Sequence, residues 1–308
     1  MRILFYGTPE FAAVHLRALL GAGHEIGAVV TQPDKPLGRK KIVTPPPVKA
    51  AALEAGIPVY QPVRLRDGSF ESLVRGIAPE LAVVVAYGRL LPAGVLAIPQ
   101  YETINIHASL LPKYRGAGPI QWAILNGERE TGVTSMMVGE ELDAGDILLS
   151  KATPIGEGET YGELQERLAP LGAQLLLETV SAIESGAARR TPQDASQVSL
   201  APILTKELSP IDFHKPAFLV ARQVCGLNPW PVATLPWDER KLRVFRAFVG
   251  GETADRPGTA RADGDAISVA CGDGKTVRLT DVQLELSKRM SAADFLRGHP
   301  IEGTRQLL

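Results

Sequence analysis

Two polar side chains in this sequence have the types and the spacing needed for chemistry at a carbonyl carbon. Asn105 and His107 stand two residues apart in the run 103–107, whose composition favours a β-strand. Because strand side chains alternate between faces, we expect the amide and the imidazole to share one face. An amide can donate to a developing oxyanion, and an imidazole can donate or relay a proton near neutral pH. From spacing alone, an equally good interpretation is that both side chains only tie down the following loop.

An acidic turn after the next expected strand supplies a partner for the imidazole. Residues 140–146 read Glu-Glu-Leu-Asp-Ala-Gly-Asp, and Gly145 indicates a tight turn. A carboxylate such as Asp143, if held near His107, would fix the tautomer and the orientation of the ring. Acidic turns are common on protein surfaces, so the residues alone favour a solvated turn.

A basic, proline-rich loop is the third candidate. Residues 34–49 contain five basic side chains and one acidic side chain, and Arg39, Lys40 and Lys41 are consecutive. The proline and glycine content excludes a helix or a central strand. A basic, irregular loop in an otherwise neutral chain suits a nucleic-acid phosphate backbone, although a plain solvated loop fits the residues equally well.

The elements that must position these residues alternate between strand and helix through the first part of the chain. Apolar strands are expected at residues 2–6, 26–31, 57–61, 81–87, 103–107 and 132–138. Helices are expected at residues 9–20, 48–55, 70–77, 120–126 and 160–185. Repeated β-α-β units predict an α/β fold with a Rossmann-like, doubly wound, mostly parallel sheet. Ligands bind at the carboxyl ends of the strands in such sheets, where His107 would stand.

The alternation between strands and helices ends near residue 187. We expect a catalytic domain at 1–187, a polar linker at 188–205 and a C-terminal domain at 206–308. After a helix at 216–225 the apolar period becomes two, with strands expected at 241–249, 267–271, 276–279 and 282–286. This pattern predicts a small, OB-like β-barrel. Lys241 and Arg243 should lie on one face of the first of these strands.

Composition narrows the class of protein without identifying its chemistry. The 308 residues include 33 basic and 34 acidic side chains, and the apolar fraction of 45% is typical of soluble globular proteins. No apolar run approaches the roughly 20 residues that cross a bilayer. The cysteines Cys225 and Cys271 lack metal-binding spacing, and the N-terminal run is a strand rather than a signal peptide. We therefore expect a cytoplasmic protein without a metal ion, and we expect it to be monomeric. The first strand ends in Gly7-Thr-Pro-Glu10 rather than GxGxxG, which argues against a dinucleotide-dependent dehydrogenase.

Three motifs contain the candidate catalytic residues or lie next to them in the sequence. They are Asn105-x-His107-x-Ser109-Leu-Leu-Pro112, Tyr114-Arg-Gly-Ala-Gly-Pro119 and Leu142-Asp143-Ala-Gly-Asp146. Together they resemble the formyltransferase family that uses 10-formyltetrahydrofolate, and the similarity covers nearly the whole chain. The basic loop, with Gln32-Pro-Asp-Lys-Pro-Leu-Gly-Arg39, and the segment Asn228-Pro-Trp-Pro231 resemble the branch of that family that formylates initiator methionyl-tRNA.

The resemblance implies a set of roles. The catalytic residues would be Asn105, His107 and Asp143. The residues beside the folate would be Ser109, Leu110, Leu111 and Pro112, and the contacts with the tRNA acceptor stem would be Arg39, Lys40 and Lys41. The co-substrate would be 10-formyltetrahydrofolate, and the partner would be initiator methionyl-tRNA, whose methionine α-amine receives the formyl group for translation initiation.

Competing functions stay open at this point. An amino-sugar N-formyltransferase would share the Asn-His-Asp set and the folate donor, but it would not need a basic, proline-rich loop. A non-enzymatic binder of folate or tRNA would keep its function when His107 is replaced. A glycinamide ribonucleotide formyltransferase would leave the last hundred residues unexplained.

Overall fold

The computed structural model of the protein describes residues 1–38 and 41–307. Its contacts divide the chain into two compact units made of interleaved segments. The first unit consists of Met1–Ala117, Gly132–Thr153 and Gln165–Ala201. The second unit consists of Gly118–Thr131, Pro154–Leu164 and Pro202–Leu308. The sequence-based division at residues 187 and 206 stays a prediction.

The first unit is built on a mostly parallel sheet, which confirms the predicted α/β fold. Among the described residues this sheet has the strand order β5-β2-β1-β6-β7-β8-β9. The strands are β1 (Arg2–Gly7), β2 (Glu25–Val30), β5 (Val59–Tyr60), β6 (Leu81–Val85), β7 (Thr103–His107), β8 (Glu130–Met137) and β9 (Ile147–Pro154). The chain proceeds from β1 to one side through β2 and β5 and then to the other side through β6 and β7, all of them parallel. The next strand, β8, runs antiparallel to β7.

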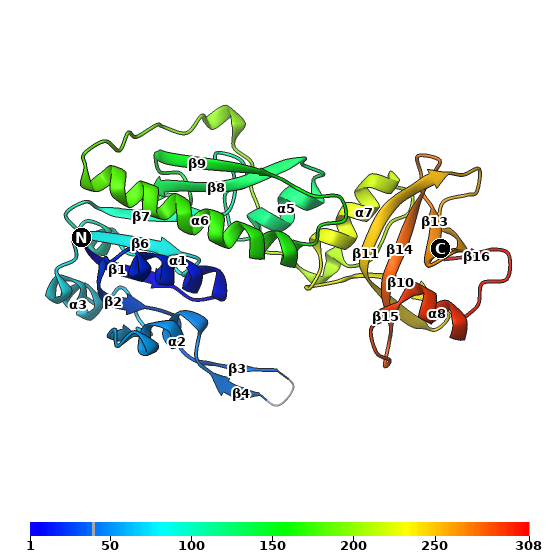
Figure 1. Cartoon of the computed structure of the whole chain (residues 1–308), viewed down its shortest axis with the longest axis horizontal. Coiled ribbons are helices and arrows are strands. Elements are labelled where there is room, and N and C mark those ends of the chain that lie inside the picture. The colour runs from blue at the N-terminus through cyan, green and yellow to red at the C-terminus, as the bar shows by residue number, and fades with distance from the viewer. Residues whose placement is uncertain (39–40, 308) are drawn as a thin grey trace. The chain divides into compact units, whose positions relative to one another are not determined.

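Helices cover both faces of this sheet. They are α1 (Glu10–Gly21), α2 (Pro47–Glu54), α3 (Ser69–Ile77), α4 (Ala93–Leu96) and α6 (Tyr161–Glu184). The apolar residues Phe70 and Val74 of α3 pack against Tyr6 of β1 on one face. On the other face α1 and α6 lie side by side over the strands (Figure 1). Ile106 of β7 lies close to α6 there, so Asn105 and His107 point to the opposite face.

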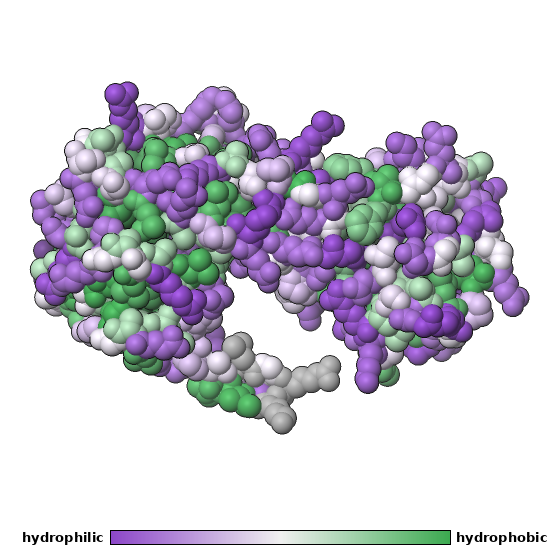
Figure 2. All heavy atoms as spheres, viewed as in Figure 1, coloured by the Kyte–Doolittle hydropathy of each residue, from purple (hydrophilic) through white to green (hydrophobic). Residues whose placement is uncertain are grey.

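The basic loop folds into a two-stranded element of its own. Strands β3 (Lys35–Leu37) and β4 (Ile42–Thr44) pair antiparallel and project from the rest of their unit (Figure 1). At the base of this hairpin the Lys49 ammonium contacts the Asp34 carboxylate at 2.8 Å. Figure 2 shows apolar surface on the hairpin, where Ile42 and Val43 are exposed. The predicted contacts Arg39 and Lys40 lie outside the described residues, whereas Lys41 is exposed with a left-handed φ of 49°.

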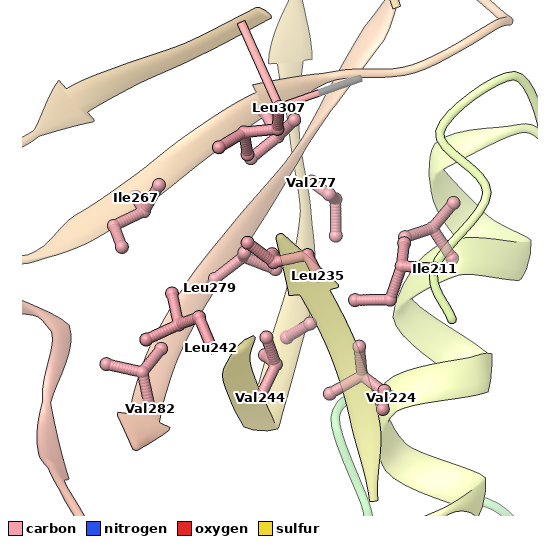
Figure 3. Close-up of a cluster of buried hydrophobic side chains, with 14 of the residues drawn as sticks. Ile211, Val224, Leu235, Leu242, Val244, Ile267, Val277, Leu279, Val282 and Leu307 are labelled. Atoms are coloured by element: carbon pink, nitrogen blue, oxygen red, sulfur yellow. The ribbon is translucent and has the colours of Figure 1, made fainter. Parts of the chain in front are cut away.

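The second unit contains an antiparallel sheet with the strand order β10-β11-β14-β13-β12-β16. The strands are β10 (Ala233–Trp237), β11 (Arg240–Glu252), β12 (Thr259–Asp263), β13 (Ala266–Ala270), β14 (Lys275–Leu284) and β16 (Arg305–Gln306), and β15 (Met290–Ser291) pairs with β14. The helices are α5 (Pro119–Leu125), α7 (Ala217–Gly226) and α8 (Ala292–Gly298). The sheet curls as a half-barrel around apolar side chains such as Val224, Leu242 and Leu279 (Figure 3), which confirms the barrel-like prediction.

This sheet confirms some of the strands predicted from the sequence and corrects others. Leu242 and Val244 of β11 are buried while Lys241 and Arg243 are exposed, as the alternation predicts. The strands predicted at 276–279 and 282–286 are wrong as separate elements, because β14 continues through both as far as Leu284. The register of β14 with β11 shifts on either side of Arg246, which pairs with Asp281. None of the described helices is both long and apolar enough to span a membrane.

Candidate active site

Asn105 occupies the middle of β7, between β6 and β8 in the sheet. It is the one residue of β7 that is partly exposed, and the other four are buried. Its side-chain amide makes no hydrogen bond to another described residue. A polar side chain at the centre of a sheet normally costs free energy unless it is hydrogen-bonded. The free, accessible amide of Asn105 therefore marks a place where a ligand can approach the sheet.

His107 ends β7, and its ring is almost completely buried. Its Nε2 lies 2.8 Å from the carbonyl oxygen of Tyr114, so Nε2 carries a proton and donates it to that oxygen. Its Nδ1 faces the carboxylate of Asp143, with 3.7 Å between Nδ1 and Oδ2. The ring is therefore oriented by one tight hydrogen bond and by one looser contact with a carboxylate.

Asp143 reaches His107 because the acidic turn is pressed against the sheet. Its backbone has a left-handed φ of 51°, and its Oδ2 accepts a hydrogen bond from the Gly116 amide at 2.8 Å. At Gly145 a Cβ would lie only 1.9 Å from the carbonyl oxygen of Met137 in β8, so only glycine fits there. The structure thus brings Asp143 to His107, and the interpretation of this segment as a merely solvated turn is wrong.

The predicted folate segment 109–112 forms a tight turn that is anchored to β8. Ser109 is fully buried, and its hydroxyl donates to the carbonyl oxygen of Lys113 at 2.7 Å. The Thr134 hydroxyl donates to the Ser109 carbonyl at 2.7 Å and accepts from the Leu111 amide at 3.2 Å. Ser109 and Leu111 thus shape the turn, while Leu110 and Pro112 are only partly buried. The binding role of these four residues stays a prediction.

A further segment that the sequence does not connect with the site closes over these loops. We call residues 191–201 the strap. Thr191 exchanges two backbone hydrogen bonds with Ile147, at 2.8 and 2.9 Å. The Ser199 carbonyl accepts from the Arg115 amide at 2.9 Å, and the Ala201 amide donates to the Arg115 carbonyl at 2.7 Å. The strap is polar and irregular, so it carries no periodic signal that could have revealed this role.

A cavity of about 640 Å³ lies in the first unit, between the segment after β5 and the segment after β6. Its lining residues are Val63, Arg64, Leu65, Arg66, Asp67, Arg89 and Leu90. Arg89 donates to the carbonyl oxygens of Pro62 and Val63, which joins the two segments. With three guanidinium groups and one carboxylate, the cavity suits an anionic ligand.

The chemistry available to this arrangement is addition to a carbonyl group. Asn105 offers an uncommitted hydrogen-bond donor, and the pair His107 and Asp143 offers groups that hold or move a proton. In residues 1–38 and 41–307 no cluster of three or more potential metal ligands occurs.

Comparison with known proteins gives matches along both parts of the chain. Residues 1–180 match the family model described as formyl transferase, and residues 203–300 match the model described as formyl transferase, C-terminal domain. The methionyl-tRNA formyltransferase of Pelotomaculum thermopropionicum is 46% identical, with 98% of this chain and 96% of that protein covered. The methionyl-tRNA formyltransferase of Geobacter sulfurreducens is 45% identical, with 99% and 96% covered.

Solved structures share the fold at lower identity. The sugar 3N-formyl transferase WlaRD, in the presence of dTDP and 5-N-formyl-THF, superposes with a TM-score of 0.71 at 17% identity, covering 94% of this chain and 99% of that chain. HypX from Aquifex aeolicus, in complex with tetrahydrofolic acid, gives a TM-score of 0.65 at 22% identity, covering 96% of this chain and 47% of that chain.

Proposed function

The chain belongs to the formyl transferase family, and from this premise we propose that it formylates initiator methionyl-tRNA for translation initiation. The formyl donor is 10-formyltetrahydrofolate, and the acceptor is the α-amine of the esterified methionine. The observation that carries the proposal is the similarity to relatives named methionyl-tRNA formyltransferase, which extends over nearly the full length of both chains and includes the C-terminal unit.

Asn105 serves the bond-making step in this proposal. The amine nitrogen attacks the formyl carbon, a new C–N bond forms, and the bond from that carbon to N10 of the folate breaks. Negative charge develops on the formyl oxygen during the attack. The accessible amide of Asn105 donates to this oxygen, and it does so without giving up a hydrogen bond to the protein.

His107 and Asp143 serve the proton transfers. The amine must lose a proton, and N10 must gain one as it leaves. Because Nε2 of His107 is held by the Tyr114 carbonyl, Nδ1 is the nitrogen that can exchange a proton. The 3.7 Å gap between Nδ1 and Asp143 leaves the contact loose, as is common for catalytic groups before the substrate binds.

Replacement of Asn105 by alanine tests the proposed chemistry. Loss of one oxyanion donor typically lowers kcat by about 10²–10³-fold, and we expect this loss for Asn105→Ala. Thermal stability should change little, because the amide is partly exposed. The assay follows formyl transfer from 10-formyltetrahydrofolate to methionyl-tRNA under saturating substrates. Near-normal turnover by the variant would contradict the assignment.

Acceptor controls separate this function from its competitors. Free methionine and an amino-sugar nucleotide replace methionyl-tRNA in the same assay, and neither should be formylated at a comparable rate. Formylation of the sugar but not of the tRNA would establish the amino-sugar alternative. If His107→Ala leaves all activity intact, the protein is a binder rather than an enzyme.

Contacts with tRNA can be tested on β11. Lys241 and Arg243 are exposed on one face of this strand, and we propose that they neutralise phosphates of the acceptor arm. We propose separately that the β3–β4 hairpin contacts the acceptor stem. Each alanine replacement should weaken binding and reduce the slope of log K against log salt by about 1. The matched control is Arg261→Ala, because Arg261 is already paired with Asp255. Filter binding that does not change with salt would contradict a phosphate-binding surface.

The predicted monomeric state and cytoplasmic location stay predictions.

A further inference from the structure

One glutamine side chain connects the strap to both loops of the site. Gln193 is partly buried, whereas Thr191, Pro192 and Asp194 beside it are exposed. Its Nε2 donates to the carbonyl oxygens of Asp143 at 2.9 Å and Gly145 at 2.8 Å. These two bonds fix the backbone of the acidic turn on either side of Ala144.

The other end of the same amide holds the neighbouring loop. Its Oε1 accepts from Nε of Arg115 at 3.0 Å and from Nη2 at 2.9 Å, which is a two-pronged contact with one edge of the guanidinium. An amide has two N–H donors and one oxygen with two lone pairs, so all the hydrogen-bonding capacity of Gln193 is used. Gln193 is therefore a cross-link between the loop 114–116 and the turn 141–145.

Both segments that Gln193 joins also orient the candidate catalytic pair. The Tyr114 carbonyl accepts the Nε2 proton of His107, and the Gly116 amide donates to Oδ2 of Asp143. Gly116 has a φ of 121°, and a Cβ there would lie 2.7 Å from the Ala201 carbonyl oxygen, so the strap fits closely over this loop. A displacement of either segment would change the separation between His107 and Asp143.

We propose that Gln193 is a positioning residue for formyl transfer, which holds the left-handed turn of Asp143 at its working distance from His107. This inference rests on the proposed function. Gln193 contacts neither the imidazole nor the carboxylate itself, and it acts through the backbone of Asp143 and Gly145 and through Arg115. The segment between the two predicted domains thereby belongs to the active site.

Two replacements of Gln193 and one control test the proposal. Gln193→Ala removes the whole cross-link. Gln193→Glu has nearly the same shape and can still accept from Arg115, but it cannot donate to the two carbonyl oxygens. Gln197→Ala is the matched control, because Gln197 is an exposed glutamine of the same strap whose amide donates to Asp194 at 3.0 Å.

The expected result is a selective loss of kcat. A misplacement of about 1 Å can cost about 100-fold in rate, so both Gln193 variants should lose about 10- to 100-fold in kcat. Their KM values for folate and tRNA should stay within about twofold, and Gln197→Ala should match the wild type. Equal kcat values for Gln193→Glu, Gln197→Ala and the wild type would overturn the proposal. A Gln193→Ala chain that fails to fold leaves Gln193→Glu to decide the question.

A coupling measurement distinguishes positioning from general stabilisation. In an Asp143→Asn background the carboxylate that Gln193 positions is already lost, so adding Gln193→Ala should lower the single-turnover rate by less than about twofold. A further loss equal to that in the wild-type background would overturn the proposal. If the wild-type protein does not formylate methionyl-tRNA, the proposed function fails. If the wild type is active and the Gln193 variants are equally active, only the positioning role fails.

Discussion

The buried histidine of α1 predicts that the first unit loses stability in mild acid. His15 is fully buried, and its Nδ1 lies 2.7 Å from the carbonyl oxygen of Phe11, to which it donates. Its Nε2 is also buried and has no hydrogen-bond partner among the described residues. Burial lowers the pKa of His15 from 6.5 to about 4, although the Phe11 carbonyl opposes the shift. The folded protein is therefore more stable with the neutral form of the ring.

The size of the effect follows from proton linkage. In the unfolded chain His15 takes up its proton as the pH falls below 6.5, whereas in the folded chain it does so only near pH 4. The stability that the neutral ring provides is thus complete above pH 6.5 and is lost as the pH falls towards 4. One pKa unit corresponds to about 1.4 kcal/mol, so the free energy of unfolding should fall by about 2 kcal/mol between pH 7.5 and pH 5. This is a large part of a typical total of about 5–15 kcal/mol.

Urea unfolding of the wild type and His15→Asn at pH 7.5 and pH 5 measures this contribution. The asparagine amide can still donate to the Phe11 carbonyl, but it does not titrate. The variant should be less stable at pH 7.5 because it packs less well, yet its stability should depend less on pH by about 2 kcal/mol. Carboxylates titrate in both proteins, so their effect cancels in the comparison.

Identical pH dependence in the two proteins would refute the reasoning. It would mean that Nε2 of His15 gains a proton in the folded state at no cost, through a water or a rearrangement next to Gly172. A Cβ at Gly172 would lie 2.5 Å from Nε2, so the space beside the ring is narrow.

Two further predictions concern the turn beside the site and the cysteines. Gly145→Ala should destabilise the protein by about 1–3 kcal/mol and lower the rate of formyl transfer, because the new Cβ would meet the Met137 carbonyl oxygen. Gly139→Ala is the control, because a Cβ at Gly139 meets nothing within 4 Å. Equal melting temperatures for Gly145→Ala and Gly139→Ala would contradict this account. Burial raises the pKa of Cys225 to about 11 and that of Cys271 to about 12. Neither thiol should therefore react with Ellman's reagent at pH 8 until urea unfolds the chain. Rapid reaction of the native protein would show that a thiol is accessible.

Much of the fold could be predicted from local patterns. The apolar run Leu81–Val85 becomes β6 because its side chains can be buried on both faces of a parallel sheet. The alternation in β11 places Lys241 and Arg243 outside and Leu242 inside, as expected. The pattern failed where one strand continued through a polar stretch, because pairing with β11 keeps β14 extended through Asp281. Such pairing lies between residues that are far apart in the sequence, and it leaves no local signal.

The candidate site, like the fold, could be predicted only in part from the sequence. The sequence alone determined that Asn105 and His107 share a face at the end of a parallel strand, because strand alternation is a local property of the backbone. Only the tertiary structure decided that Asp143 meets His107 and that Gln193, 50 residues further along, fixes the turn of Asp143. These contacts depend on irregular loops held by long-range hydrogen bonds, and irregular backbone has no periodicity from which a sequence could reveal its partners.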